Sequence, residues 1–220
     1  MRHIVWFSCG VASAVTAMLV KKEIPEAMLI RIWLKREHED NDRFANDVER
    51  LLKCKITTLK ADKYEADHEK VIEETGWVNG VGGARCTGEL KKAVRHQFQQ
   101  PDDVQYFGYT AEPRERERAK RLVDRFPEIN ARFPLIENGL TKKDCAGIIN
   151  KLGIELPMMY RLGFNNNNCI GCVKGGMGYW NKIRKEFPEN FERMAKLERK
   201  VGRSEEHTSE LQSPYVISYA

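Results

Sequence analysis

Short apolar segments alternate with amphipathic helical segments over the first 150 residues, and this alternation limits the fold more than any other feature. Four segments have the length and apolar character of strands: His3–Phe7, Ala27–Leu34, Lys55–Leu59 and Val104–Tyr109. Helical periodicity appears after each of them, at Ala12–Lys22, Asn41–Lys53, Tyr64–Glu73 and Pro113–Phe126. Strands separated by helices of this length form βαβ units with parallel strands. The sequence therefore predicts an α/β fold, a doubly wound and mostly parallel sheet in a Rossmann-like α/β/α sandwich.

The character of the chain changes near residue 153. Thr141-Lys-Lys-Asp144 has the form of a capping box and predicts a helix that ends at about Leu152. The next stretch is rich in glycine and asparagine, and two basic helical segments follow at Tyr179–Phe187 and Phe191–Lys200. We expect a sheet domain over residues 1–152 and a small irregular and helical C-terminal module over residues 153–202.

The last 18 residues are set apart from the rest. Residues 203–220 resemble the translation of a short-read sequencing adapter, so we expect a non-biological tail and a missing natural C-terminus. The tail holds one Arg and three Glu, so residues 1–202 carry a net charge of +7 against +5 for the whole chain. This positive balance favours anionic partners such as nucleotides, phosphates or RNA without choosing among them.

Composition also bears on the compartment. No apolar run approaches the roughly 20 residues of a membrane helix, and no basic-then-apolar leader opens the chain. The six cysteines suit a reducing environment, in which a C-x-x-C pair indicates metal or redox chemistry more often than a disulfide. We expect a cytoplasmic protein with no membrane partner.

The turn after the first apolar segment is the first candidate site. Ser8-Cys9-Gly10-Val11-Ala12-Ser13 leads a strand into a helix, and the N-terminus of a helix presents backbone N–H groups that bind phosphate. Ser8, Gly10 and Ser13 are the candidate ligand-binding residues. An ordinary βα turn with small residues is the alternative.

Two further segments carry charged side chains next to glycine. The first segment is Gly82-Gly83-Ala84-Arg85-Cys86-Thr87-Gly88-Glu89-Leu90-Lys91. Its Arg85 suits bidentate binding of phosphate oxygens, and its Lys91 supplies a point charge. The second segment is Gly108-Tyr109-Thr110-Ala111-Glu112-Pro113-Arg114-Glu115-Arg116-Glu117-Arg118. Its candidates for facing a ligand are Glu112, Arg116 and Arg118. Solvated charge, and a salt-bridged helix surface in the second segment, are the alternatives.

Cys169-Ile-Gly-Cys172 places two thiols in a glycine-rich loop where both reach one metal ion. A closed zinc or iron–sulfur site needs about four ligands, and Cys86 and Cys145 are the available additions. A site of Cys86, Cys145, Cys169 and Cys172 is one hypothesis, and a redox dithiol or two inert thiols are the others. Cys9 and Cys54 are interpreted as structural.

Together these elements resemble the phosphoadenosine phosphosulfate (PAPS) reductase family of the PP-loop superfamily, over about residues 3–180. The first turn is similar to the S-G-G-x-D-S loop of PP-loop ATP pyrophosphatases, with Cys9 in place of a glycine and Ala12 in place of the aspartate. Arg85–Lys91 is similar to the family's R-C-T-x-x-L-K element. The segment from Gly108 is similar to its G-x-R-x-x-E-S-x-x-R element, without the first arginine. The proteins of phages and mobile elements are the most similar branch, with Gly-Tyr-Trp-Asn-Lys after the C-x-x-C.

The resemblance implies a protein that binds an adenine nucleotide, ATP or PAPS, and carries out sulfonucleotide reduction or related sulfur chemistry. It also implies a thiol reductant protein as partner and a 4Fe-4S cluster or zinc at the cysteines. The family's E-C-G-x-H signature is absent from residues 1–202, so we predict that this chain binds the nucleotide without reducing it. The alternatives are an ATP-dependent adenylating or sulfur-transfer enzyme acting on nucleic acid or a small molecule, and a non-catalytic nucleotide-binding module with a structural zinc.

Overall fold

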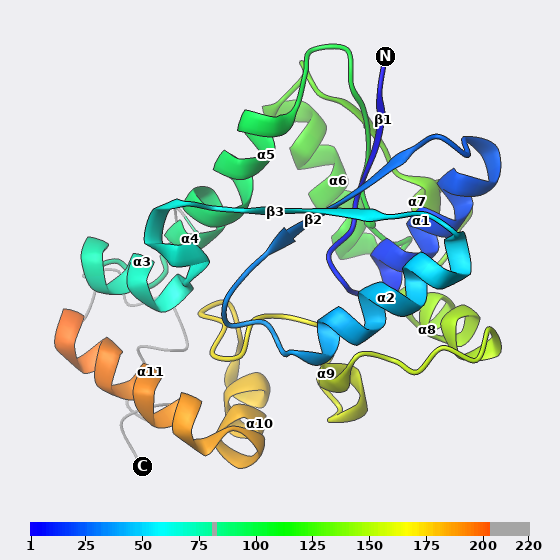
Figure 1. The fold of residues 1–220 in the computed structure, drawn as a ribbon. Helices are drawn as coiled ribbons and strands as arrows, with labels where there is room; N and C mark the ends of the chain where they lie inside the picture. The colour runs from blue at the N-terminus through cyan, green and yellow to red at the C-terminus, as the bar shows by residue number, and fades with distance from the viewer. Residues whose placement is uncertain (81–82, 203–220) are drawn as a thin grey trace. The chain divides into compact units, whose positions relative to one another are not determined.

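The structure, a computed structural model, describes residues 1–80 and 83–202. Gly82 of the second motif and the tail at 203–220, assigned above to adapter sequence, lie outside the described residues. Five strands form one parallel sheet in the order β3-β2-β1-β4-β5, of which Figure 1 labels β1, β2 and β3. Their bounds are β1 His3–Trp6, β2 Met28–Trp33, β3 Ile56–Lys60, β4 Val104–Tyr106 and β5 Asn130–Arg132. The predicted α/β fold with a parallel, Rossmann-like sheet is confirmed.

Helices connect the strands and follow the last one. The longer helices are α1 Val11–Glu23, α2 Asp40–Leu52, α3 His68–Thr75, α6 Pro113–Arg125, α8 Lys142–Lys151, α10 Met177–Glu186 and α11 Pro188–Val201. The shorter ones are the 3-10 turn η1 Lys63–Ala66, then α4 Arg85–Thr87, the π-helical turn η2 Gly88–Lys92, α5 Ala93–Phe98, α7 Pro134–Glu137 and α9 Met158–Arg161. Among the described residues no helix is both long and apolar enough to cross a membrane.

The direction in which the chain adds strands reverses at β1. The chain first runs from β1 outward through β2 to β3, and it then returns to place β4 on the other side of β1, with β5 beyond it. Ile4 pairs with Met28 of β2 on one side and with Gln105 of β4 on the other. In open parallel sheets a ligand binds beyond the carboxyl ends of the two strands at which the order reverses. For this sheet those strands are β1 and β4.

The described residues divide into two compact units, each built from separate stretches of chain. The first contains residues 1–32, 39–59 and 98–161, and the second contains residues 33–38, 60–97 and those from 162 onward. The boundary therefore differs from the division at residue 153 that the sequence predicts. Residues 60–97 join the second unit because α3 packs against both α4 and α11.

Each unit has its own apolar core. In the first unit, Val5 of β1 and Leu29 of β2 pack with buried side chains of α1, α2, α7 and α8. In the second, Trp180 of α10 is fully buried and its ring lies edge-on to that of Phe191 of α11 at 6.2 Å.

The second unit also contains a buried ion pair. Asp67 is 1% exposed, and it binds the guanidinium of Arg36 at 2.8 Å.

Several predicted elements differ in detail. The single helix expected at Tyr64–Glu73 is wrong, because Tyr64, Glu65 and Ala66 have positive φ and Asp67 caps a new helix, α3, by accepting a hydrogen bond from the backbone N–H of Glu69. The helical run from Arg85 to Phe98 and the edge strand β5 were not predicted. The Thr141–Asp144 capping box is confirmed on α8.

Candidate functional site

The loop between β1 and α1 is a tight turn closed by the Ser13 hydroxyl. This hydroxyl donates to the carbonyl of Gly10 at 2.9 Å and accepts from the backbone N–H of Ser8 at 3.1 Å. The Ser8 hydroxyl lies 3.3 Å from it. Cys9 has a φ of 54°, a left-handed conformation that costs a non-glycine residue free energy and persists only where its surroundings hold it. The loop is therefore rigid and specified by its own hydrogen bonds.

The two serines have different roles in this geometry. Ser13 is buried and its hydroxyl is engaged within the loop, so it shapes the turn. Ser8 is exposed just beyond β1, and its hydroxyl donates to that of Ser13 at 3.3 Å. Gly10 is the N-cap of α1 and contributes no side-chain cap, and the first turn of α1 contains no acidic residue. The positive end of the α1 dipole is thus left for an external anion.

The loop after β4 lies directly against the start of α1. A Cβ atom added to Gly108 would lie 3.0 Å from the backbone nitrogen of Ser13 and 3.1 Å from the carbonyl carbon of Ala12. Only glycine lets the two backbones approach this closely. The structure therefore brings the first and third sequence motifs together at the carboxyl ends of β1 and β4, where the strand order reverses.

Glu112 and Arg116 lie just beyond this contact, at the start of α6. The Glu112 carboxylate accepts a hydrogen bond from the backbone N–H of Lys142 at 2.8 Å. Burial raises the pKa of Glu112, but the nearby Thr110 hydroxyl and the hydrogen bond from the Lys142 backbone N–H outweigh it, and the pKa is lowered overall. Arg116 is exposed, and its Nε donates to the carbonyl of Ala111 at 2.8 Å. Both side chains hold the loop that carries Gly108, so they are positioning residues in this structure.

Arg85 and Lys91 belong to the second unit. Arg85 is half exposed and its Nε lies 3.4 Å from Glu89, one helical turn further on. The Lys91 ammonium lies 3.6 Å from the carboxylate of Glu37. Burial lowers the pKa of Lys91, but Glu37 and the thiols of three cysteines reverse this effect and raise it. The ammonium form of Lys91 is therefore favoured.

The three cysteines around Lys91 are Cys86, Cys169 and Cys172. Burial raises the pKa of the Cys169 thiol, and Lys91 opposes that shift. Burial also raises the pKa of the Cys86 thiol, and Cys172 adds to the shift. Three of the four predicted metal ligands thus interact electrostatically with Lys91, and neither Lys91 nor Glu37 belonged to the metal hypothesis.

A tyrosine and a histidine hold the C-x-x-C loop in place. The Tyr179 hydroxyl donates to the carbonyl of Cys169 at 2.6 Å and accepts from the backbone N–H of Cys172 at 2.9 Å. His68 is 3% exposed, and its Nε2 donates to the carbonyl of Gly171 at 3.2 Å. Burial lowers the pKa of His68, which keeps the ring neutral. Sequence reasoning missed both residues, although Tyr179 stood in the Gly-Tyr-Trp element.

Cys145 has different surroundings. It lies on α8 in the core of the first unit, fully buried in a cluster that includes Val15 and Ile149. Burial raises the pKa of its thiol to about 12. These neighbours supply no metal ligand, and they favour the interpretation of Cys145 as a small buried apolar residue. Cys9 lies in the same core and Cys54 packs against it, in keeping with structural roles.

Across residues 1–80 and 83–202, no three His, Cys, Asp or Glu side chains are arranged to hold a metal ion. The three thiols of the second unit are nevertheless ligands of the type that zinc and iron–sulfur clusters take. The donors therefore have the right chemistry, but they do not form a complete set.

The first unit also contains a pocket. It has a volume of about 480 Å³ and opens between the C-terminal ends of α1 and α2, with Met18, Leu51 and Leu52 as its apolar lining. The Lys21 ammonium on its rim donates to the backbone carbonyl of Ala27 at 3.2 Å. The pocket contains none of the residues that the sequence singled out.

No protein-family model matches this chain, and a search of curated proteins found no match. The family resemblance therefore rests on the motifs alone and stays a prediction.

Proposed function

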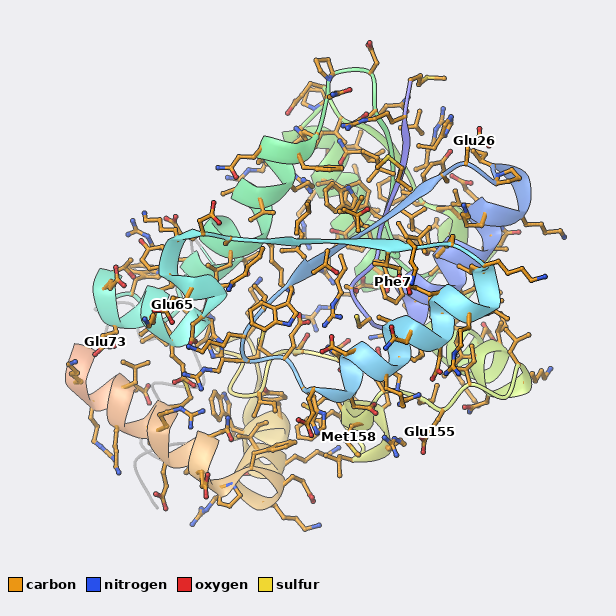
Figure 2. All side chains as sticks on the ribbon, viewed as in Figure 1. Phe7, Glu26, Glu65, Glu73, Glu155 and Met158 are labelled. Carbon is orange, nitrogen blue, oxygen red and sulfur yellow. The ribbon has the colours of Figure 1, made fainter. Side chains whose placement is uncertain are left out.

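We propose that the chain binds an adenine nucleotide, ATP or a sulfonucleotide such as PAPS, with its phosphate groups at the N-terminus of α1. The observation that supports this most is the reversal of strand order between β1 and β4. The Ser8–Ser13 turn and Gly108 follow those two strands and are in backbone contact. Phe7, labelled in Figure 2, ends the apolar run that leads into this turn.

Each residue of the turn has a separate task in this proposal. Backbone N–H groups of the first turn of α1 bind the phosphate oxygens, and the helix dipole favours their charge. Ser8 adds a hydroxyl that turns from Ser13 to the phosphate when the ligand binds, and Ser13 keeps the turn in shape. Gly10 leaves the N-terminus of α1 uncovered by a side chain, and a Cβ there would meet the Tyr160 hydroxyl at 3.2 Å.

The absence of an acidic side chain from the first turn of α1 favours a sulfonucleotide over Mg²⁺-assisted ATP cleavage. Ala12 occupies the position where the S-G-G-x-D-S loop has its aspartate, so the turn lacks a carboxylate for a bound cation. The resemblance favours sulfonucleotide reduction or related sulfur chemistry, with electrons from a thiol reductant protein. Because the E-C-G-x-H signature is absent from residues 1–202, we expect this chain to bind the sulfonucleotide without reducing it. ATP-dependent adenylation or sulfur transfer, and non-catalytic nucleotide binding, are the competing functions.

Calorimetric titration of the full chain with ATP, PAPS and its unphosphorylated analogue tests the proposal. We expect PAPS to bind without Mg²⁺, and Ser8→Ala to bind it more weakly because a hydrogen bond to an anion is lost. Thr58→Val, which removes an exposed hydroxyl from β3 in the same unit, is the matched control and leaves binding unchanged.

A second variant separates the ATP reaction from sulfonucleotide binding. Ala12→Asp places a carboxylate beside the phosphates, so binding without Mg²⁺ weakens and binding of Mg²⁺-ATP strengthens. If none of the three nucleotides binds to the wild-type chain, the proposal is wrong. Thiol-dependent sulfite release by the wild-type chain would contradict the prediction that it binds the sulfonucleotide without reducing it, and pyrophosphate release from ATP would favour adenylation.

The three thiols of the second unit support a second candidate function, thiol or metal chemistry. We propose that Cys86, Cys169 and Cys172 hold zinc or a 4Fe-4S cluster, which would supply structural support or electron transfer when bound. Because the described ligand set is incomplete, no chemical step is assigned to such a group. In anaerobically purified protein, iron with sulfide supports a cluster, and about one zinc per chain supports a structural site. The absence of both iron and zinc would favour a redox dithiol or inert thiols.

A further inference from the structure

Helix α6 carries an exposed row of arginines. Its 13 residues include six basic and three acidic side chains, and Ala119 is its one buried residue. Arg114, Arg118, Arg121 and Arg125 are spaced by four, three and four residues, and all four are exposed. At about 100° per residue this spacing keeps them within an arc of about 60° on the helix surface. They form a straight row about 16 Å long, which we call the arginine row.

The arginine row is only partly neutralised. Arg118 binds Glu115 at 2.6 Å, and this is the one ion pair that α6 makes among the described residues. Glu117 and Asp124 border the row on one side. The sequence alone allowed a helix surface laced with salt bridges, and the structure instead shows a helix with net positive charge on its exposed side.

Two aromatic rings lie beside the row. Tyr109 follows β4 and Phe133 follows β5, and their ring centres are 5.7 Å apart. Both rings are partly exposed, and Phe107 packs beneath them at 6.2 Å from each. The guanidinium of Arg118 lies 5.1 Å from the centre of the Tyr109 ring. Arg118 thus joins the aromatic pair to the arginine row in one surface of the first unit, with α6 shown in green in Figure 1.

We infer that this surface binds single-stranded nucleic acid. The arginine row contacts successive phosphates, and the Tyr109–Phe133 pair stacks on an unpaired base, which is the combination that single-strand binders use. A length of about 16 Å covers several phosphates of a polynucleotide and exceeds what one mononucleotide occupies. Exposed aromatic rings favour a single strand over a duplex, because bases inside a duplex are already stacked.

The inference goes beyond the proposed nucleotide site and does not depend on it. Ser8→Ala removes a phosphate donor from the turn after β1 and leaves the arginine row intact. This variant should bind an oligonucleotide as the wild-type chain does, so failure of one proposal is distinguishable from failure of the other.

Fluorescence anisotropy with a labelled single-stranded oligonucleotide of about 12 nucleotides tests the inference over a series of salt concentrations. For single strands the slope of log K against log salt is about −0.7 for each phosphate contact. Arg121→Gln with Arg125→Gln should therefore reduce the slope by about 1.4 and weaken binding about tenfold or more at 0.1 M salt. The matched control is Lys196→Gln with Arg199→Gln, two exposed cations of α11, which should change neither value.

The aromatic pair is tested separately. Phe133→Leu keeps an apolar side chain and should weaken binding about five- to a hundredfold, with no change in the salt slope. Tyr109→Leu should act in the same direction. Thermal melting checks that each variant is folded. Tyr109 and Phe133 follow different strands, so if one variant fails to fold, the other still tests the inference.

Four results would overturn the inference. These are no binding of the oligonucleotide at low salt, equal losses in the α6 and α11 variants, tighter binding of a duplex than of the single strand, and equally tight binding of polyglutamate. The last result would indicate an acidic protein surface as the partner.

Discussion

Gly108→Ala tests the contact on which the candidate site depends. The new methyl group would lie 3.0 Å from the backbone nitrogen of Ser13 and 3.1 Å from both the Ser13 Cα and the Ala12 carbonyl carbon. All three are backbone atoms, so no flexible side chain can move aside. Gly108 is not among the glycines with positive φ, and the substitution therefore tests packing without backbone strain.

Two opposing effects set the size of the change in the free energy of unfolding. Overpacking in a well-packed region costs about 1–3 kcal/mol. The loss of chain freedom in the unfolded state favours alanine by about 0.4–1 kcal/mol. The expected net loss in the free energy of unfolding is about 1–2 kcal/mol, which corresponds to a fall in Tm of about 2–8 °C for a chain of this size. Because α1 must shift away from β4, nucleotide binding should weaken at the same time.

Thermal melting and calorimetric titration of the same variant measure both effects. The control is Gly147→Ala in the middle of α8, where an added Cβ meets no atom within 4 Å. Alanine is the better helix former there and should stabilise the chain by about 0.5–1 kcal/mol with unchanged nucleotide binding. A Gly108→Ala variant at least as stable as the wild-type chain would refute the packing argument.

Three further predictions follow from single contacts. Thr141→Ala removes the N-cap of α8 and should lower the free energy of unfolding by about 1 kcal/mol in a denaturant titration, whereas no change would show that the capping box is not formed. Hydrogen bonds from Arg43 lower the pKa of Asp40 to about 2, below its unfolded value, so the chain should lose about 2 kcal/mol of stability as the pH falls from about 4 to 2. Asp40→Asn should abolish that loss, and equal acid sensitivity of both proteins would contradict it. Tyr179→Phe removes the hydroxyl that bonds the Cys169 carbonyl and the Cys172 N–H. These two groups still bond to each other at 3.2 Å, so the substitution should cost about 1 kcal/mol and speed alkylation of Cys172, and an unchanged alkylation rate would count against the contact.

The fold follows from local patterns to a large extent. The apolar run at Ala27–Leu34 and the helical period at Asn41–Lys53 are both continuous in sequence, and each predicted its element to within one residue at either end, β2 at Met28–Trp33 and α2 at Asp40–Leu52. The break within Tyr64–Glu73 was not predictable in this way. Its cause is the left-handed backbone of three residues, and neither glycine nor proline marks it.

The candidate site was predictable only in its parts. The composition of the Ser8–Ser13 turn indicated a phosphate site, and the helix that follows it confirms the local geometry. The different roles of the two serines depend on which hydroxyl is buried. The grouping of Cys86 with Cys169 and Cys172, with Lys91 among them, depends on segments about 80 residues apart in the chain.

The sequence by itself determined the kind of structure: parallel strands joined by helices, and a small-residue turn that opens a helix. These features depend on backbone hydrogen bonding and on the spacing of apolar side chains, both of which act over a few residues. Only the tertiary structure decided that β4 lies beside β1, so that Gly108 contacts Ser13, and that Tyr109 and Phe133 meet next to the arginines of α6. Such contacts are set by strand order, which depends on the packing of the whole sheet and its helices and leaves no mark in any one segment.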